Sequence, residues 1–157
     1  KSQENGYVSP AMQTGIDREV DAQMTYEAVT GTMLTRTGFI AHDTLQAGCS
    51  LDGHIGDFEG IVEIKSPIAA THLEYLKTGK VPGDYLKQIT HGLWMTGAEW
   101  CDWLSYQPDF PEPLRVKLVR VWRKDVDLAA YELDVRLFLD EVDREVETVQ
   151  QLAGAIT

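Results

Sequence analysis

Apolar side chains return every three or four residues in several stretches of the chain, which is the spacing of one helix face. This spacing predicts helices over Asp17–Val29, Thr71–Leu76, Asp84–Thr96 and Val126–Leu152. The residues predicted to face inward are Ile16, Val20, Met24 and Ala28 in the first helix, Leu86, Ile89, Leu93 and Trp94 in the third, and Val135, Phe138, Leu139, Val142, Val146, Val149 and Leu152 in the last. The last helix is therefore predicted to have an apolar stripe along most of its length.

Between the helices, apolar and polar residues alternate, which is typical of strands that bury one face. Alternation predicts strands over Ile61–Lys65, Asp102–Tyr106 and Leu114–Trp122, and a short apolar run predicts another over Phe39–Ala41. Residues 56–60 have turn chemistry, so the segment 49–54 and the strand 61–65 should form a hairpin. The order of helix, strands, helix, two strands and helix predicts an α/β fold with a central mixed β-sheet flanked by helices.

Length and composition describe an ordinary globular chain. The 157 residues suffice for one compact domain with a core, so a single domain over 1–157 is expected. No apolar run approaches the ~20 residues that span a bilayer, and residues 1–10 lack the apolar region of a secretory signal. Cys49 and Cys101 form no CxxC pair, which favours two free thiols over a disulfide and gives no zinc-ligand spacing.

Charge is unevenly distributed. The net charge of −11 argues against a nucleic-acid partner, because phosphate binding normally needs a basic surface. Acidic residues, however, are dense over 125–147, while residues 65–87 carry Lys65, Lys77, Lys80 and Lys87 against Glu74 and Asp84. A basic groove on an acidic body is therefore possible. Lys77 and Lys80 flank a glycine-containing loop and could contact phosphates, although a solvated loop explains them equally well.

The residues that suggest chemistry are Asp52, Glu63 and Lys65. Alternation along a strand places Glu63 and Lys65 on one side with Ile64 facing the core, and the hairpin can bring Asp52 beside them. Two carboxylates and a backbone carbonyl suit Mg²⁺, and a lysine at this place can orient water or offset charge on a phosphate. The residues alone leave a second interpretation open, a solvated Glu–Lys pair beside an ordinary Asp-Gly turn.

The chain resembles the PD-(D/E)xK nucleases in two runs, Ser50-Leu51-Asp52-Gly53 and Gly60-Ile61-Val62-Glu63-Ile64-Lys65-Ser66-Pro67. More narrowly it resembles the lambda exonuclease family, also called YqaJ-like viral recombinases. Residues 15–22 are similar to the acidic helix that precedes the motif in that family. Residues 85–88 with 94–96 are similar to the helix that follows the lysine strand, and the long acidic helix at the end also fits. The resemblance extends from about residue 9 to the end of the chain, and it implies a restriction-endonuclease-like core.

The resemblance implies which residues bind metal. Asp52, Glu63 and the carbonyl of Ile64 would hold the principal Mg²⁺ ion, with Mn²⁺ as a substitute. A second ion, ~4 Å away, would be held by Asp52 with an upstream acid, of which Asp43 is the nearest.

The other matching residues receive roles from the same resemblance. Lys65 would activate the attacking water, and Glu19 would lie near that water or the metal. Gln88 and Tyr85 would help to order the site, the lysine and the nearby DNA strand. The apolar wedge that splits the terminal base pair in the family would fall near Met12.

The implied activity is Mg²⁺-dependent 5′-to-3′ digestion of linear double-stranded DNA, leaving a 3′ single strand for phage-type recombination. The resemblance also implies a ring-shaped homotrimer threaded by DNA, a single-strand annealing protein as partner, and the cytoplasm of a bacterial host with a phage or prophage. A closed ring would explain how an acidic chain stays on DNA, because topology replaces some phosphate contacts.

Two departures from the family stand out. Leu51 replaces the usual proline, which should leave the metal ligands intact. The family also has an upstream segment with an arginine and a serine or threonine that bind the 5′-phosphate, and this chain is expected to begin after it. Two alternatives therefore stay open: an endonuclease on the same core, and a non-catalytic DNA-binding module. A Cas4-like nuclease would need four cysteines for its iron–sulfur cluster, and only two are present.

The scattered histidines and tryptophans suggest no other chemistry. His42, His54, His72 and His91 form no His-x-x-x-His pair, so zinc catalysis is not expected. The tryptophans Trp94, Trp100, Trp103 and Trp122 lie in apolar settings, which favours core packing or a subunit interface over base stacking.

Overall fold

The computed structural model describes the backbone of residues 10–154 and the side chains of residues 18–154. Its helices are α1 (Pro10–Thr30), α2 (Ala69–Thr78), α3 (Gly83–Thr96) and α4 (Leu128–Gly154), with short 3₁₀ turns at Glu112–Leu114 and Arg123–Asp125. Its strands are β1 (Ile40–Ala41), β2 (Gly48–Cys49), β3 (Gly53–Ile55), β4 (Gly60–Lys65), β5 (Trp100–Tyr106) and β6 (Val116–Trp122). The predicted elements are thus present, with shifted ends.

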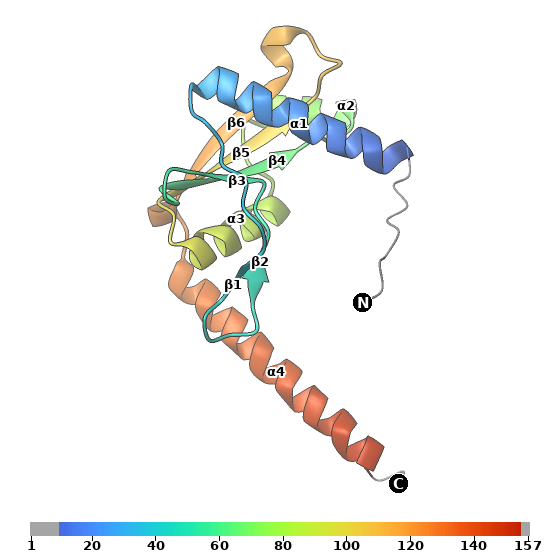
Figure 1. Ribbon diagram of the computed structural model, residues 1–157, viewed down its shortest axis with the longest axis vertical. Helices are drawn as coiled ribbons and strands as arrows, with labels where there is room; N and C mark the ends of the chain where they lie inside the picture. Colours follow the sequence, from blue (N-terminus) through green and yellow to red (C-terminus); the bar gives the residue numbers. More distant parts are fainter. Residues whose placement is uncertain (1–9, 155–157) are drawn as a thin grey trace.

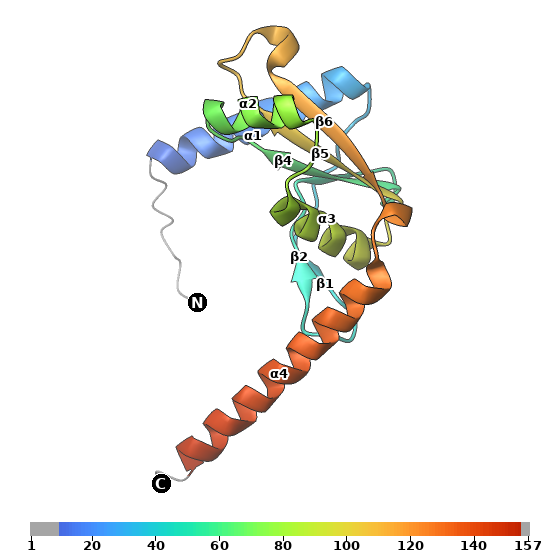
Figure 2. The same ribbon diagram turned by 180° about the vertical axis from the view of Figure 1, so that it is seen from behind.

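A four-stranded mixed sheet in the order β3-β4-β5-β6 forms the centre of the molecule. β3 and β4 are the predicted antiparallel hairpin, β4 and β5 are parallel, and β5 and β6 are antiparallel. Parallel neighbours need a long crossover, which α2 and α3 supply. α1 lies on one face of the sheet, and α2 and α3 lie on the other (Figures 1 and 2). The predicted architecture is confirmed.

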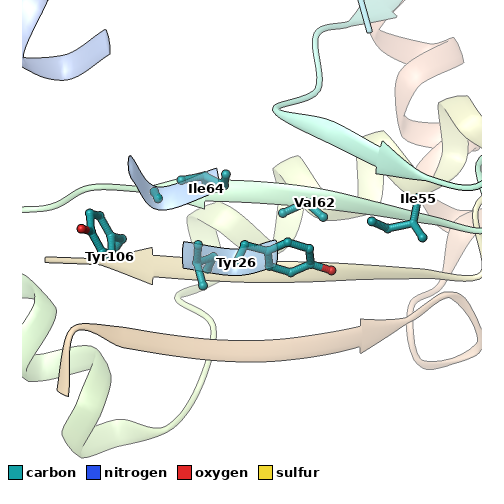
Figure 3. Close-up of a cluster of buried hydrophobic side chains, with 7 residues drawn as sticks. Tyr26, Ile55, Val62, Ile64 and Tyr106 are labelled. Carbon is teal, nitrogen blue, oxygen red and sulfur yellow. The ribbon is translucent and has the colours of Figure 1, made fainter. Parts of the chain in front are cut away.

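Each face of the sheet has its own apolar core, because successive side chains of β4 point to opposite sides. Val62 and Ile64 pack toward α1 with Tyr26, Ile55 and Tyr106 (Figure 3). Ile61 packs toward α3, in the second core. Glu63 and Lys65 alternate in phase with Ile61, so they lie on the α3 side of the sheet.

The inward face of α1 differs from the prediction. Ala22 and Tyr26 are buried, whereas Val20 is 39% exposed and Met24 is 63% exposed. The reason is a tertiary contact: the Tyr26 hydroxyl donates a hydrogen bond of 2.8 Å to Oδ2 of the fully buried Asp102. That bond turns the helix so that its tyrosine, rather than its aliphatic stripe, meets the sheet.

α3 follows the prediction except at its beginning. Ile89 and Leu93 are buried and Trp94 is half-buried, but Leu86 is 39% exposed. Gly92 is also buried, and a Cβ there would lie 2.8 Å from Cδ1 of Ile61. A residue without a side chain therefore lets α3 approach β4 closely.

α4 leaves the body of the molecule and extends away from it (Figure 1). Its predicted stripe is present, but Phe138, Val146, Val149 and Leu152 are exposed instead of packed. Within residues 10–154 no helix has the length and apolar character needed to cross a bilayer. Both cysteines are buried and free, as predicted.

Candidate active site

The β3–β4 hairpin brings Asp52 next to β4. Gly53 is in register with Val62, so Asp52 lies one position beyond the start of β3, alongside Glu63 and Ile64. Oδ2 of Asp52 accepts a hydrogen bond of 2.6 Å from the backbone N–H of Ile64. This bond fixes the Asp52 carboxylate at the edge that β3 leaves unpaired.

The Ile64 carbonyl belongs to the same edge. A residue of a strand directs its N–H and its C=O toward the same antiparallel neighbour. Since the Ile64 N–H points to Asp52, its carbonyl oxygen also points toward the Asp52 side of β4. Two kinds of oxygen, carboxylate and carbonyl, therefore converge there.

Glu63 and Lys65 form an ion pair on the α3 side of β4. Glu63 is only 6% exposed, and Lys65 is half-buried. Nζ of Lys65 also lies 5.1 Å from the centroid of the Tyr85 ring, a cation–π distance. The lysine ammonium is thus held between a carboxylate and an aromatic face.

The electrostatics of the two carboxyls favour a cation. Burial raises the pKa of Asp52, and the charge of Glu19 raises it further, while the Ile64 N–H and Lys65 lower it. Burial also raises the pKa of Glu63, Lys65 lowers it, and the charge of Asp52 raises it again. The net effect is upward for both groups, so their negative charges are incompletely compensated by the protein alone.

The donor set fits a hard divalent cation with few protein ligands. Mg²⁺ is commonly bound through one or two carboxylates, with water and phosphate oxygens completing the octahedron. Asp52 and Glu63 supply two carboxylates, and Ile64 supplies one backbone carbonyl oxygen. Among the described side chains no group of three or more His, Cys, Asp and Glu residues is placed to hold a metal ion. Asp43, exposed in the turn after β1, does not join Asp52 and Glu63 in such a group.

The remaining predicted residues lie on α1, α2, α3 and the loop after α2. Glu19 is an exposed residue of α1 whose charge acts on Asp52, and Gln88 is exposed on α3. Lys77 and Lys80, at the end of α2 and in the following loop, are also exposed. Met12 belongs to α1, but its side chain lies outside the described residues.

Gln23 is a supporting residue that the sequence patterns did not single out. Its Nε2 donates a hydrogen bond of 3.2 Å to the backbone carbonyl of Asp52, and its Oε1 accepts two hydrogen bonds from Arg36. Gln23 therefore connects α1 to the segment that carries the first carboxylate. Its spacing of four from Glu19 puts both on one helix face, which is the signal that could have revealed it.

His91 and His72 serve the scaffold. His91 pairs with the Tyr131 hydroxyl at 2.8 Å and with the Gly48 carbonyl at 3.1 Å, joining α3 to α4 and β2. His72, fully buried, contacts Ser105 Oγ and the Leu114 carbonyl, each at 2.8 Å. Both rings have their nitrogens occupied by protein groups, so neither adds a donor to the centre at Asp52.

Known proteins resemble the chain both in sequence and in structure. The sequence profile of the YqaJ-like viral recombinase domain matches residues 1–99. The crystal structure of an alkaline exonuclease, LHK-Exo, from Laribacter hongkongensis shares 36% identity over 96% of this chain and 78% of its own, with a TM-score of 0.87. LHK-Exo in complex with dAMP matches equally well, at 36% identity, over 97% of this chain and 78% of its own, with a TM-score of 0.87.

A more distant structure shares the fold. A phage related exonuclease from Haemophilus somnus 129PT is 13% identical over 93% of this chain and 77% of its own, with a TM-score of 0.62. No curated protein sequence is significantly similar to the chain.

Proposed function

Because the chain belongs to the YqaJ-like viral recombinase family, we propose that it is a Mg²⁺-dependent 5′-to-3′ exonuclease of linear double-stranded DNA. The family and the likeness to LHK-Exo make it a nuclease of the exonuclease type. The metal, the polarity and the 3′ single-stranded product are the parts that we propose. The observation that carries the proposal is the gathering of the half-buried Asp52 carboxylate, the buried Glu63 carboxylate and the Lys65 ammonium.

The cation would be held by Asp52, Glu63 and the Ile64 carbonyl. When bound, Mg²⁺ would neutralise phosphate charge and make a water molecule a stronger nucleophile. A second ion, shared by Asp52 and an upstream acid such as Asp43 or Glu19, is part of the proposal. Calorimetric titration with Mg²⁺ or Mn²⁺ distinguishes one bound ion per chain from two, because two ions give a stoichiometry of two.

Lys65 is the proposed catalytic cation. Its ammonium lies beside Glu63, where it can donate a hydrogen bond to the attacking water and offset the charge that develops on the phosphate oxygens. Tyr85 faces that ammonium with its ring, and Gln88 lies one turn further along α3. Glu19 is the proposed acceptor near the water, because its carboxylate is close enough to act on Asp52.

Phosphate contacts outside the centre are proposed for Lys77 and Lys80. No acidic side chain lies within ion-pair distance of either lysine among the described residues. Both charges are therefore available to backbone phosphates. Met12 keeps its proposed role as the wedge at the terminal base pair, on the resemblance alone.

A ring-shaped homotrimer is proposed as the working assembly, and the exposed stripe of α4 supports association. The acids of α4 are Glu132, Asp134, Asp140, Glu141, Asp143, Glu145 and Glu147, against Arg136 and Arg144. Seven negative charges against two disfavour side-by-side pairing of two α4 helices. A ring instead uses heterologous contacts, in which α4 of one subunit meets a different surface of its neighbour.

The biological setting belongs to the same proposal. A 3′ single strand is the substrate of a single-strand annealing protein, which we propose as the partner, and the reaction would take place in the cytoplasm of a bacterium that carries the phage or prophage. Both statements rest on the family.

The test of the catalytic assignment is Lys65→Ala with Lys124→Ala as the matched surface control. We expect Lys65→Ala to lower hydrolysis at least ~10²-fold, with the melting temperature and DNA association retained, since positioned proton-transfer groups contribute on this scale. Asp52→Ala and Glu63→Ala should abolish the calorimetric signal for Mg²⁺. Hydrolysis by Lys65→Ala at the rate of Lys124→Ala would refute the assignment.

A further inference from the structure

Three aromatic rings from three different elements meet beside the candidate active site. Tyr75 lies on α2, Tyr85 on α3 and Trp103 on β5. The ring centroids of Tyr75 and Trp103 are 5.1 Å apart at 71°, those of Tyr75 and Tyr85 are 6.4 Å apart at 82°, and those of Tyr85 and Trp103 are 5.9 Å apart at 32°. We call these three residues the aromatic cluster.

The aromatic cluster is joined to the candidate active site at two places. Trp103 is the register partner of Glu63 in the parallel β4–β5 pair. Tyr85 presents its ring to Nζ of Lys65, at 5.1 Å. A shift of the Tyr85 ring would therefore change the position that the Lys65 ammonium can take.

The Lys65 side chain needs contacts with neighbouring residues to be held in a single conformation. A lysine side chain has four rotatable bonds and loses ~2 kcal/mol of rotamer entropy when fixed. In the structure Glu63 and Tyr85 hold the ammonium together. A divalent cation on Glu63 would compete with the ammonium for that carboxylate, which leaves the Tyr85 ring as the contact that keeps Lys65 in place.

Tyr85 in turn is held by packing. It lies in the first turn of α3, after the loop 79–82, and is half-buried. Trp103 is fully buried, and its Nε1–H has no hydrogen-bond partner among the described residues, so ring contacts rather than a hydrogen bond orient its indole. Tyr75 touches both other rings edge-on, from a separate helix.

The hydroxyls of the two tyrosines also lie near each other. Burial is the main reason why the pKa of Tyr75 is raised to about 12, and the hydroxyl of Tyr85 raises it in the same direction. Tyr75 therefore stays protonated and neutral at the pH of any ordinary assay, and its contribution is one of shape and contact, with no change of charge.

We propose that Tyr75 is a positioning residue for hydrolysis: it fixes the Tyr85 ring, and the Tyr85 ring fixes the Lys65 ammonium at the reacting phosphate. The inference rests on the proposed function, because it needs Lys65 to act in the reaction. A displacement of ~1 Å in a reacting group can lower a rate ~10²-fold, so loss of the Tyr75 ring should be visible in kcat.

The experiment measures kcat and KM on linear duplex DNA in Mg²⁺, together with melting temperatures, for four variants of the full chain. Tyr75→Leu removes the ring, and Tyr75→Phe keeps the ring without the hydroxyl. Tyr85→Leu is made alone and combined with Tyr75→Leu. The matched control is Tyr131→Leu, which removes another half-buried tyrosine whose hydroxyl is bonded and whose ring contacts His91 and Trp94.

We expect Tyr75→Leu to lower kcat ~10-fold or more with KM within about twofold, and Tyr75→Phe to recover most of that loss. Tyr131→Leu should lower the melting temperature while keeping kcat per folded molecule. In the Tyr85→Leu background Tyr75→Leu should cause little further loss, because residues that act in series are not additive. Should Tyr75→Leu fail to fold, Tyr75→Met takes its place, because the flexible unbranched side chain of methionine fills irregular gaps without supplying a ring.

The inference is overturned if Tyr75→Leu keeps the kcat of the wild type, or if it lowers kcat by the same factor with and without Tyr85. Both results presuppose an active wild type, so they leave the proposed function standing. A wild type that does not hydrolyse linear duplex in Mg²⁺ would instead refute the proposed function and, with it, the role of Tyr75.

Discussion

At the scale of single residues, the burial of Asp52 and Glu63 acts on folding as well as on metal binding. Burial raises the pKa of both carboxyls. A carboxyl whose pKa is higher in the folded state contributes stability that is complete below its unfolded pKa and is lost as the pH rises through its folded pKa. In metal-free protein these two groups should therefore oppose folding more at pH 8 than at mildly acidic pH.

The substitution Asp52→Asn tests this sign. The asparagine oxygen can still accept the Ile64 N–H, but it carries no charge to bury. We expect the melting temperature in EDTA at pH 8 to rise by about 2 °C or more, the scale of ~1 kcal/mol for a domain of this size. Asp140→Asn, on the exposed side of α4, is the control and should leave the melting temperature unchanged. A lower melting temperature for Asp52→Asn would contradict the electrostatic interpretation.

A bound metal ion should offset the unfavourable charge of Asp52 and Glu63 and so raise the stability of the fold. On the proposed function, Mg²⁺ would bind the folded centre and not the unfolded chain, so it would stabilise the fold by mass action. We expect the melting temperature of the wild type to rise with Mg²⁺, and to rise more at pH 8 than at mildly acidic pH, where protons compete for both carboxyls. Asp52→Asn should respond little. An equal response of wild type and Asp52→Asn would place the ion elsewhere.

The relative positions of Asp52, Glu63 and Lys65 could be predicted because they depend on local rules. Alternation along 61–65 correctly put Glu63 and Lys65 on one side of β4, and the turn at 56–60 correctly paired it with the segment of Asp52. Asp52 itself ends up just before β3, outside the strand. Tyr75 was missed because its ring contacts join separate elements and leave no regular spacing with the motif. Gln23 was missed although its spacing of four from Glu19 puts both on one helix face.

At the scale of elements, the facing of α1 shows where periodicity fails. Val20 and Met24 satisfied the helical spacing, yet Tyr26 faces the sheet and bonds to Asp102. Asp102 also takes two hydrogen bonds of 2.8 Å from Arg120, which satisfies a fully buried carboxylate. Residues 26 and 102 are 76 positions apart, so no local pattern could reveal that they meet.

The start of β4 offers a test of packing at this scale. A Cβ at the buried Gly60 would collide with the indole ring of Trp100, which is itself held against the Arg120 guanidinium at 3.6 Å. We expect Gly60→Ala to lower the free energy of unfolding by ~1–3 kcal/mol, the usual range for overpacking.

Urea denaturation measures this change, with Gly38→Ala as the control, because a Cβ at Gly38 meets no atom within 4 Å. Gly38→Ala should be nearly neutral. If Gly60→Ala were equally neutral, Trp100 would be free to move, and the packing described between β4 and β5 would be wrong at that point.

At the scale of the whole molecule, the mixed sheet and its flanking helices were predictable from the order of the elements, and the resemblance to the YqaJ-like family is confirmed. The role of the last helix, α4, was not predictable from the order of the elements. A stripe at helical spacing indicates a buried face but not what buries it, and on α4 that face is exposed in the single chain.

The assembly can be tested on that face. Phe138, 63% exposed, lies within the stripe of α4. We expect the wild type to have the mass of a trimer in light scattering and Phe138→Glu to shift it toward the monomer, because a charge would have to be desolvated in the interface. Asp134→Asn on the same helix is the control. A monomeric wild type would remove the ring from the proposal without affecting the catalytic centre.

The central claim, an exonuclease centred on Asp52, Glu63 and Lys65, is tested most directly by comparing linear with closed circular duplex. Equal masses of both are incubated with Mg²⁺, and the linear DNA has one strand labelled at its 5′ end. We predict that the linear DNA is shortened with early release of the 5′ label, leaving 3′ single strands, that the circle stays intact, and that EDTA stops the reaction. Cutting of the closed circle, or no hydrolysis of either substrate, would contradict the claim.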